Sequence, residues 1–247
     1  MSVNSKNFPH ALKARKHLCA VDARLKKVID QVGVVTIELK RGDSVYESLA
    51  TSIVYQQLHG KAAATILGRF KAHYPGTAFP PPKKVTATSL ETLRSCGLSG
   101  SKAAAILDLA AKVDAGLLPT LEQATAMTDL ELIENLTQVK GIGRWTVEMF
   151  LIFTLGRTDV LPVADYGVRN GFTKVYRRKE MPTPKELEKI GAKWAPFRSA
   201  AAWYFWRALE LQEFQTSKKI KSKKLPLKIK SKKQAVTLTA TLKRAAL

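Results

Sequence analysis

Apolar residues recur at spacings of three and four along most of this chain, which is the period of a helix with one buried face. Leu18, Leu25 and Ile29 belong to the first such stripe, within residues 11–32. Residues 34–39 alone have the composition of a strand, but they are few and lack an evident partner, so strand and loop both stay open. The pattern predicts an all-α fold, with helices that begin after Asp43 or Ser44 and at Lys185, and helices over 61–72, 90–95, 102–114, 128–136, 144–155, 166–175 and 197–214.

Proline, glycine and charge mark the breaks in this pattern. Residues 74–84 hold four prolines and are predicted to form a loop, and residues 96–102 look like a tight turn between two helices. From Ser217 onward the composition changes, with eleven Lys or Arg and no acid in 31 residues. Such a run cannot bury enough apolar surface to fold. We therefore predict one domain over residues 1–216 and a disordered basic tail over residues 217–247.

The charge of the chain indicates what kind of partner it has. The net charge is +21, and without the tail there remain 30 basic and 20 acidic residues, a net charge of +10. A polyanion is the simplest partner for such a protein, and nucleic acid is the commonest polyanion. A hydrophobic content of 45% supports a sizeable core and argues against a purely structural basic protein of the chromatin or ribosome type.

Cysteine usage and hydropathy exclude other classes of protein. Cys19 and Cys96 are the only cysteines, so the chain has neither a disulfide framework nor a cysteine-based metal cluster. No apolar run reaches membrane-spanning length, and the N-terminus lacks the hydrophobic region of a signal peptide. We expect an intracellular protein, in cytoplasm, nucleoid or nucleus, with no membrane partner.

The stretch that organises the chain is residues 136–150. An apolar run stops at Lys140, Gly141-Ile142-Gly143 forms a tight turn, and a strongly apolar helix follows from about Arg144. Glycine admits positive φ and lets another backbone approach closely. Amide groups at a helix start have no partner within the helix, and the helix dipole favours an anion there. The stretch therefore predicts a helical hairpin whose amides can hold a phosphate of nucleic acid.

Two further motifs surround this hairpin. Residues 161–169, Leu-Pro-Val-Ala-Asp-Tyr-Gly-Val-Arg, place Asp165 in a segment rich in Gly and Pro downstream of the hairpin, and residues 46–63 form an apolar helix pair broken at Gly60. Together the three motifs resemble the helix-hairpin-helix DNA glycosylase superfamily, and within it the 3-methyladenine-DNA glycosylase II, or alkylbase, branch. The resemblance covers roughly residues 40–215. It implies a two-lobed helical fold with the active-site cleft between the lobes.

Asp165 stands at the position of the family's catalytic aspartate. Taken alone, an aspartate before Tyr-Gly-Val-Arg is an ordinary helix N-cap, and both roles can hold together. Breaking a base–sugar bond develops positive charge on the sugar, which a carboxylate stabilises, and the carboxylate can also orient or deprotonate water. Some relatives have a second aspartate where this chain has Ala164. A single carboxylate suffices when alkylation has already made the leaving base cationic.

Trp145 separates two branches of the superfamily. In the lyase branch, the second residue after Gly-x-Gly is a lysine that attacks the sugar, and an indole cannot be that nucleophile. A ring at this position can instead stack on a flipped base, and Met149, one turn further on, shares the pocket wall; Phe197 and Trp203 are further candidates for the base pocket. A core role stays open for each ring. Aromatic faces favour a cationic methylated purine by about 0.5–2 kcal/mol.

The remaining site residues are assigned by resemblance. Gln57 fills the hole left by the flipped nucleotide, because extrusion of a base costs a few kcal/mol, and Leu58 and His59 accompany it at the minor groove; a plain polar turn is the alternative. Hairpin contacts to DNA come from Gly141, Gly143, Arg144 and Thr146. The carbonyls of Thr137, Val139 and Gly141 are candidate ligands of a structural Na⁺ or K⁺.

These features predict a monofunctional DNA glycosylase of base excision repair. It hydrolyses the N-glycosidic bond of alkylated purines, of the 3-methyladenine and 7-methylguanine type, and leaves an abasic site. Its partner is double-stranded DNA with a flipped base, its state is monomeric, and it requires no cofactor and has no iron–sulfur cluster. The alternatives are a bifunctional glycosylase/lyase acting on oxidised bases, which Trp145 disfavours, and a non-catalytic DNA-binding module, which Asp165 and Trp145 together disfavour.

Overall fold

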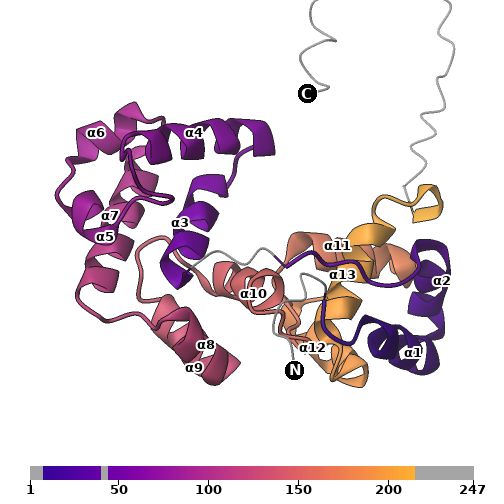
Figure 1. Cartoon of the computed structure of the whole chain (residues 1–247). Helices are drawn as coiled ribbons and strands as arrows, with labels where there is room; N and C mark the ends of the chain where they lie inside the picture. The colour runs from indigo at the N-terminus through magenta and orange to yellow at the C-terminus, as the bar shows by residue number, and fades with distance from the viewer. Residues whose placement is uncertain (1–7, 40–43, 215–247) are drawn as a thin grey trace, which may run out of the picture. The chain divides into compact units, whose positions relative to one another are not determined.

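The computed structural model describes residues 8–39 and 44–214, and in these ranges it is built from α-helices and two short 3₁₀ helices (Figure 1). The all-α fold class is therefore confirmed. The basic tail lies outside the described residues. The α-helices are α1 (Ala11–Val21), α2 (Ala23–Val32), α3 (Val45–Tyr55), α4 (Gly60–Ala72), α5 (Pro82–Thr86), α6 (Leu90–Ser95), α7 (Gly100–Asp114), α8 (Leu121–Ala126), α9 (Asp129–Leu136), α10 (Arg144–Phe153), α11 (Tyr166–Val175), α12 (Pro184–Gly191) and α13 (Arg198–Ala208), and the 3₁₀ helices are Ala192–Trp194 and Gln212–Phe214.

Several helix boundaries differ from those predicted by hydrophobic periodicity. The stripe over residues 11–32 is two helices, because Asp22 leaves the helical conformation and its side chain caps α2 through the amides of Arg24 and Leu25. The predicted loop over 74–84 ends in a short helix, α5, and α8 occupies a segment with no predicted helix. The predicted helix over 197–214 ends at Ala208. Residues 34–39 contain no regular strand.

Helix α7 is the centre of one group of helices. It packs against α3, α5 and α6 (Figure 1). Its buried side is lined by alanine, isoleucine and leucine. Lys102, in its first turn, donates hydrogen bonds to the carbonyls of Val54 at 2.8 Å and Gln56 at 2.6 Å. These bonds satisfy carbonyls at the C-terminal end of α3, which have no partner within their own helix. The ammonium group thereby fixes the corner that follows α3.

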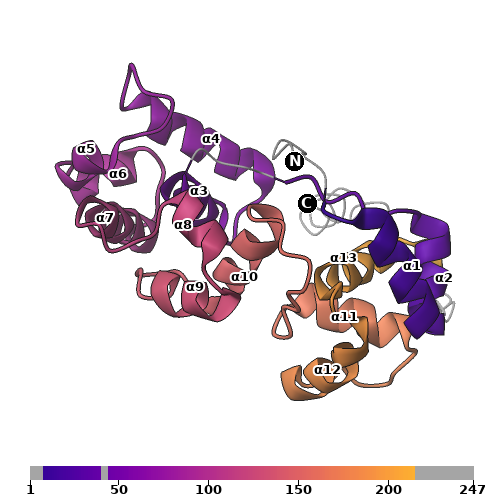
Figure 2. The same ribbon diagram turned by 60° about the horizontal axis from the view of Figure 1, so that its bottom comes forward.

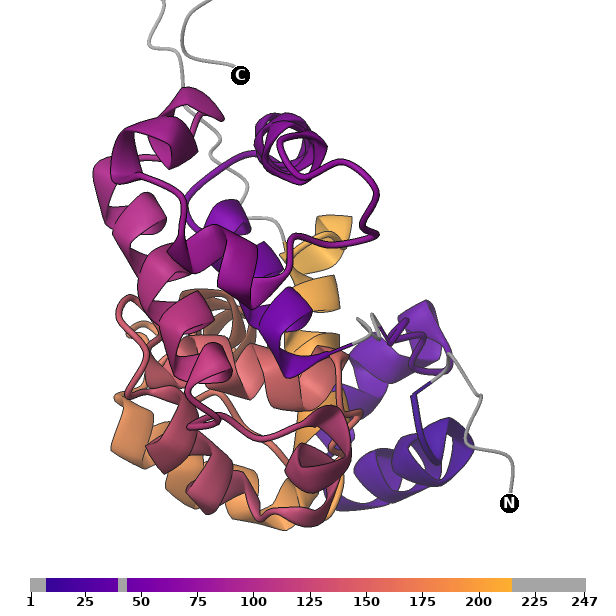
Figure 3. The same ribbon diagram turned by 60° about the vertical axis from the view of Figure 1, so that its left-hand side comes forward.

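Helices α11 and α13 form the centre of a second group. A Cβ atom added to Gly171 in α11 would lie 2.1 Å from the carbonyl oxygen of Phe205 in α13, so the two backbones touch at this glycine. Helices α1 and α2 pack on α13, as Figure 2 and Figure 3 show. The division of the molecule into two lobes with a cleft between them remains a prediction.

A buried carboxylate joins α2 to α11 and to the 3₁₀ helix before α13. Asp22 is 3% exposed and accepts hydrogen bonds from the Tyr176 hydroxyl and from the Trp194 indole at 2.8 Å, with the Lys193 ammonium 3.1 Å away. Burial by itself raises the pKa of the Asp22 carboxyl, but the hydrogen bonds outweigh it and leave that pKa below its usual value. The same burial, and the bond to Asp22, raise the pKa of the Tyr176 hydroxyl.

Candidate active site

The Asp165 carboxylate is held by three hydrogen-bond donors. Its Oδ1 accepts the backbone N–H of Val168 at 2.7 Å and the indole N–H of Trp206 at 2.8 Å, and its Oδ2 accepts the indole N–H of Trp145 at 2.7 Å. The first of these bonds makes Asp165 the N-cap of α11, as the sequence predicts. The two indoles come from α10 and α13, so three helices together fix the direction of this carboxylate.

A glycine makes the contact between Asp165 and Trp206 sterically feasible. A Cβ atom added to Gly167, in the first turn of α11, would lie 2.8 Å from Cδ1 of Trp206 and 3.1 Å from Oδ1 of Asp165. Real Cβ atoms do not approach other atoms as closely as 2.8 Å, so any other residue would displace the indole. Gly167, two residues after Asp165, is therefore needed for the contact between the Trp206 indole and the Asp165 carboxylate.

The hairpin before α10 is tied to the neighbouring helices. Gly141 has φ +79°, a conformation that favours glycine, whereas Gly143 is extended with φ −98°. Only the first glycine of the motif thus supplies positive φ. The Lys140 amide donates to Oδ2 of Asp108 in α7 at 2.7 Å, and the Gly141 carbonyl accepts the side-chain amide of Gln56 at 3.1 Å.

The start of α10 presents free amides. The backbone N–H groups of Gly143, Arg144 and Trp145 donate no hydrogen bond to another residue in the described part of the chain. Arg144 is largely exposed, and its guanidinium is held by the buried Glu148 carboxylate at 3.0 Å. Burial raises the pKa of Glu148, and Arg144 partly offsets this effect. An exposed cation beside unpaired amides suits a phosphate group.

The corner between α3 and α4 projects polar and apolar side chains into solvent. Gln57 has φ +56°, a conformation that is uncommon for a residue other than glycine, and its side chain is exposed. Leu58 is 39% exposed, and His59 is exposed as well. Strained backbone at an exposed corner is a common mark of function. All three predicted residues of this corner are therefore accessible at the surface.

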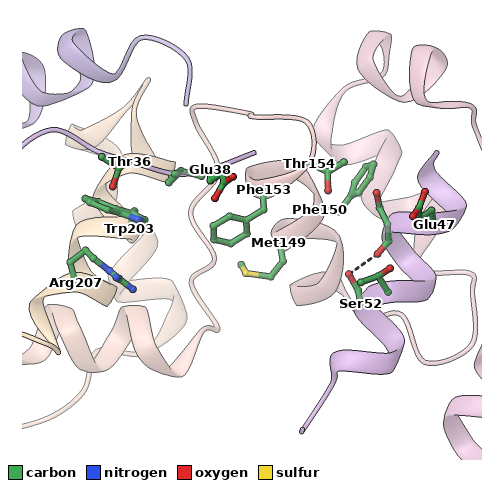
Figure 4. Close-up of a pocket in the computed structure, with 13 residues that line it drawn as sticks. Thr36, Glu38, Glu47, Ser52, Met149, Phe150, Phe153, Thr154, Trp203 and Arg207 are labelled. Carbon is green, nitrogen blue, oxygen red and sulfur yellow. Dashed lines mark hydrogen bonds between the residues drawn. The ribbon is translucent and has the colours of Figure 1, made fainter. Parts of the chain in front are cut away.

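Two cavities adjoin the candidate site. The outer cavity, of about 600 Å³, brings together four predicted site residues, Gln57, Trp145, Thr146 and Met149. The inner cavity, of about 700 Å³, is shown in Figure 4. Ser52 and Met149 line both cavities, so the two spaces adjoin at these residues. The inner cavity is otherwise lined by residues of the segment 34–39 before α3 and by residues of α3, α13 and α10 with its C-cap. They are Thr36, Ile37, Glu38, Glu47, Ser48, Thr51, Phe150, Phe153, Thr154, Trp203 and Arg207.

Three further candidates, Phe197, Thr146 and Trp203, have different surroundings. Phe197 precedes α13, and its ring lies 5.6 Å from that of His17; it is not among the residues that line the two cavities. Thr146 is buried, and its hydroxyl lies 3.5 Å from the side-chain nitrogen of Gln56, so it supports the corner after α3. Trp203 lines the inner cavity with a small part of its ring.

Sequence reasoning missed the residues that hold the site from a distance. Trp206 is 41 positions from Asp165 in the sequence. Asp108 is 32 positions from Lys140, whose backbone N–H donates a hydrogen bond to it. Gln56, next to the predicted residue Gln57, connects that corner to the hairpin through the Gly141 carbonyl, and no local pattern indicates this bond. The one available signal was the tryptophan-rich composition of residues 203–206, because a tryptophan N–H usually finds an acceptor when it is buried.

The described residues contain neither a metal-binding cluster nor a membrane-spanning helix. In residues 8–39 and 44–214, no group of three or more His, Cys, Asp or Glu side chains is placed to hold a metal ion. Cys19 and Cys96 are both free thiols. None of the helices described has the length and apolar character needed to cross a membrane.

The chain is similar to known proteins of base excision DNA repair. Residues 50–197 match the family model described as HhH-GPD superfamily base excision DNA repair protein. DNA-3-methyladenine glycosylase 1 of Schizosaccharomyces pombe is 40% identical over 216 residues, which cover 86% of this chain and 92% of that protein.

Two solved structures resemble the chain closely. One is the Schizosaccharomyces pombe 3-methyladenine DNA glycosylase in complex with abasic DNA, with a TM-score of 0.74 and 40% identity, covering 81% of this chain and 98% of the other. The second is the DNA-3-methyladenine glycosidase of Bacillus halodurans, with a TM-score of 0.70 and 36% identity, covering 84% and 91%. With the match of the family model and the Asp165 site in the place that the motif predicts, the chain belongs to the HhH-GPD superfamily of base excision DNA repair proteins.

Proposed function

We propose that this protein is a monofunctional DNA glycosylase of the DNA-3-methyladenine type, which hydrolyses the N-glycosidic bond of alkylated purines in DNA. The observation that carries the proposal is the Asp165 carboxylate, held by two indoles and a backbone amide beside a cavity. The relatives named 3-methyladenine DNA glycosylases, one of them in complex with abasic DNA, support the same substrate class.

The proposed reaction uses one carboxylate and one water molecule. The bond between the sugar and the alkylated purine breaks, the base takes the bonding electrons, and the sugar becomes an oxocarbenium-like cation. Asp165 stabilises that cation and orients the water that adds to it, and the proton lost by the water goes to solvent through the carboxylate. The products are the free base and an abasic site.

We assign the DNA contacts to the exposed corner and the hairpin. Gln57, with Leu58 and His59 beside it, fills the space left by the flipped nucleotide. The amides of Gly143 and its neighbours, with Arg144, bind a phosphate, and Gly141 shapes the turn that presents them. Trp145 and Met149 contact the flipped nucleotide, and Phe197 is not needed for this assignment. The protein acts as a monomer on double-stranded DNA, and an intracellular location stays a prediction.

A structural Na⁺ or K⁺ ion fits the hairpin. The Val139 carbonyl accepts the Ile142 amide at 3.0 Å and the Gly141 carbonyl accepts Gln56 at 3.1 Å, so each keeps one lone pair for an ion. With the Thr137 carbonyl they would supply oxygen ligands, which hard cations prefer. The ion would strengthen the attraction of the hairpin for phosphate. The reaction itself requires no cofactor.

The test is the release of bases from DNA treated with a methylating agent. The purified protein should release methylated purines and leave abasic sites without cutting the strand. Borohydride added during the reaction should trap no covalent adduct, because Trp145 occupies the position at which a lyase has lysine. A trapped adduct that disappears on mutation of one lysine would move the protein to the bifunctional branch. An absence of released bases would reject the glycosylase assignment.

A further inference from the structure

A carboxylate faces the inner cavity from the segment that precedes α3. In residues 35–39 alternate side chains, those of Val35, Ile37 and Leu39, are buried in the core. An extended chain sends successive side chains to opposite sides, so Thr36 and Glu38 point away from that core and are exposed; both line the cavity, together with Ile37. Figure 4 shows Glu38 beside the ring of Phe153.

The inner cavity lies one aromatic ring away from the residues that hold Asp165. The Phe153 ring stacks on Trp206 with 5.8 Å between ring centroids, and the Trp206 indole donates to the Asp165 carboxylate. On its other side the cavity shares Met149 with the outer cavity, where Trp145 lies. A purine whose sugar reaches Asp165 can therefore extend past Met149 into the inner cavity. A volume of about 700 Å³ lies within the range of small-molecule pockets.

Carboxylates and aromatic rings both line this cavity. Glu38 and Glu47 carry carboxylates, and Arg207 carries the only positive charge among the lining residues. The Arg207 guanidinium lies 2.9 Å from the Glu210 carboxylate and stands over the face of Trp203, so these groups offset part of its charge. A carboxylate such as that of Glu38, combined with aromatic faces, attracts a delocalised cation and gives a neutral base no comparable gain.

We propose that Glu38 is a specificity-determining residue, whose carboxylate favours purines made cationic by alkylation over neutral purines in the inner cavity. The inference rests on the proposed function and narrows its substrate class. Bases that carry a formal positive charge, such as 7-methylguanine and 3-methyladenine, gain from Glu38. Neutral damaged purines, such as hypoxanthine, do not gain from it.

The test compares single-turnover excision of 7-methylguanine from a defined duplex by the full chain and two variants. Glu38→Gln removes the charge and keeps the shape of the side chain. Glu180→Gln removes one exposed carboxylate from the turn between α11 and α12, so it makes the same change in net charge away from the cavity. We expect about a fivefold slower excision by Glu38→Gln, the effect of one solvent-screened unit charge near a substrate charge. Glu180→Gln should match the wild type.

A second measurement separates an effect on the base from an effect on DNA. Affinity for a duplex with an abasic-site analogue, which has no base to fill the cavity, should be equal for wild type and Glu38→Gln. Equal excision by Glu38→Gln and wild type would overturn the inference and leave the proposed function intact. An equal loss of excision and of abasic-site affinity would also overturn it, as a general defect. A wild-type protein that releases no methylated purine would overturn both the proposed function and the inference.

Discussion

At the scale of single residues, the hydrogen bonds of Asp165 restrict the direction in which this carboxylate can act. Ionised carboxylate oxygens offer about four acceptor positions, and the donors from Val168, Trp206 and Trp145 take three of them. The remaining position belongs to Oδ2, the oxygen bound to the Trp145 indole. In the proposed reaction, the sugar cation or the water molecule would therefore meet Asp165 at this oxygen, next to the Trp145 indole.

Replacing Asp165 tests this assignment. The Asp165→Asn variant keeps the size of the side chain but loses the charge that stabilises the oxocarbenium-like sugar. We expect single-turnover base release to fall by at least ~10²-fold, the effect of losing a main electrostatic stabiliser. Affinity for abasic DNA should persist, since the hairpin and the corner after α3 are unchanged. Near-wild-type release by this variant would contradict the role of Asp165.

Asp22 is a second carboxylate whose surroundings have a measurable consequence. Because its pKa in the folded protein lies below its usual value, its charged form stabilises the fold. That contribution is complete above the pKa of the unfolded state, about 3.9, and is lost as the pH falls through the lower pKa of the folded state.

The Asp22→Asn variant should therefore unfold more easily near neutral pH. We expect a loss of about 2–4 kcal/mol in the free energy of unfolding at pH 7, because hydrogen bonds to a buried charge are replaced by weaker ones. The difference from wild type should shrink below about pH 4. Urea titrations at several pH values measure both effects, and a difference that stays constant down to pH 3 would argue against the linkage.

At the scale of whole elements, the packing of α11 against α13 places the carboxylate beside its second indole. Gly171 lets the α11 backbone touch the Phe205 carbonyl, and Gly167, one turn earlier, admits the Trp206 ring to Asp165. Both glycines lie on the face of α11 that meets α13. The close approach of the two helices and the geometry of the site thus have one cause, the absence of side chains along this face.

A pair of glycine substitutions tests the helix contact. Gly171→Ala would place its Cβ atom 2.1 Å from the Phe205 oxygen, so the helices must move apart. We expect a loss of about 1–3 kcal/mol in unfolding free energy, as for other overpacked sites. Gly68→Ala in α4 is the control, because nothing lies within 4 Å of its added Cβ atom. The control should be neutral or slightly stabilising, and equal effects of the two variants would refute the close packing.

Elements with strong local signals were predictable, and contacts across the chain were not. The hairpin glycines, the cap at Asp165 and the corner at 57–59 are short-range patterns, and each was found in its predicted place. The break at Asp22 was missed, since an apolar stripe can continue across two helices that share one core. The contact between the rings of Phe197 and His17 could not be predicted, because composition does not state which neighbour a ring contacts. The role of Trp206 depends on how α13 packs on α11, which periodicity does not encode.

At the scale of the whole molecule, charge sets how the protein meets DNA. The folded body and the tail each carry excess positive charge, and the tail adds eleven cations with no acid. We propose that the tail is a non-specific tether to DNA. Each phosphate contact that it makes releases condensed counterion, so binding depends more steeply on salt when the tail is present.

Deleting residues 217–247 tests the tether. If about four phosphate contacts form on average, the slope of log affinity against log salt should become shallower by roughly 3–4 units. Base release at saturating DNA and low salt should barely change, because the tail is not part of the proposed site. Identical salt slopes for full-length and truncated protein would reject the tether. A truncated protein that binds DNA normally and cannot excise would place the tail at the active site.

The hydrogen bond between the Lys140 amide and the Asp108 carboxylate holds the hairpin in place before DNA binds. Lys140 is exposed, yet its N–H donates to a carboxylate of α7 at 2.7 Å, and Gln56 secures the next carbonyl along the chain. The hairpin is thus ordered during folding, and little conformational entropy remains to be lost when a phosphate arrives. In hydrogen–deuterium exchange, the Lys140 amide should exchange slowly with or without DNA, whereas the amides of Gly143 and Arg144 should become protected only in the complex.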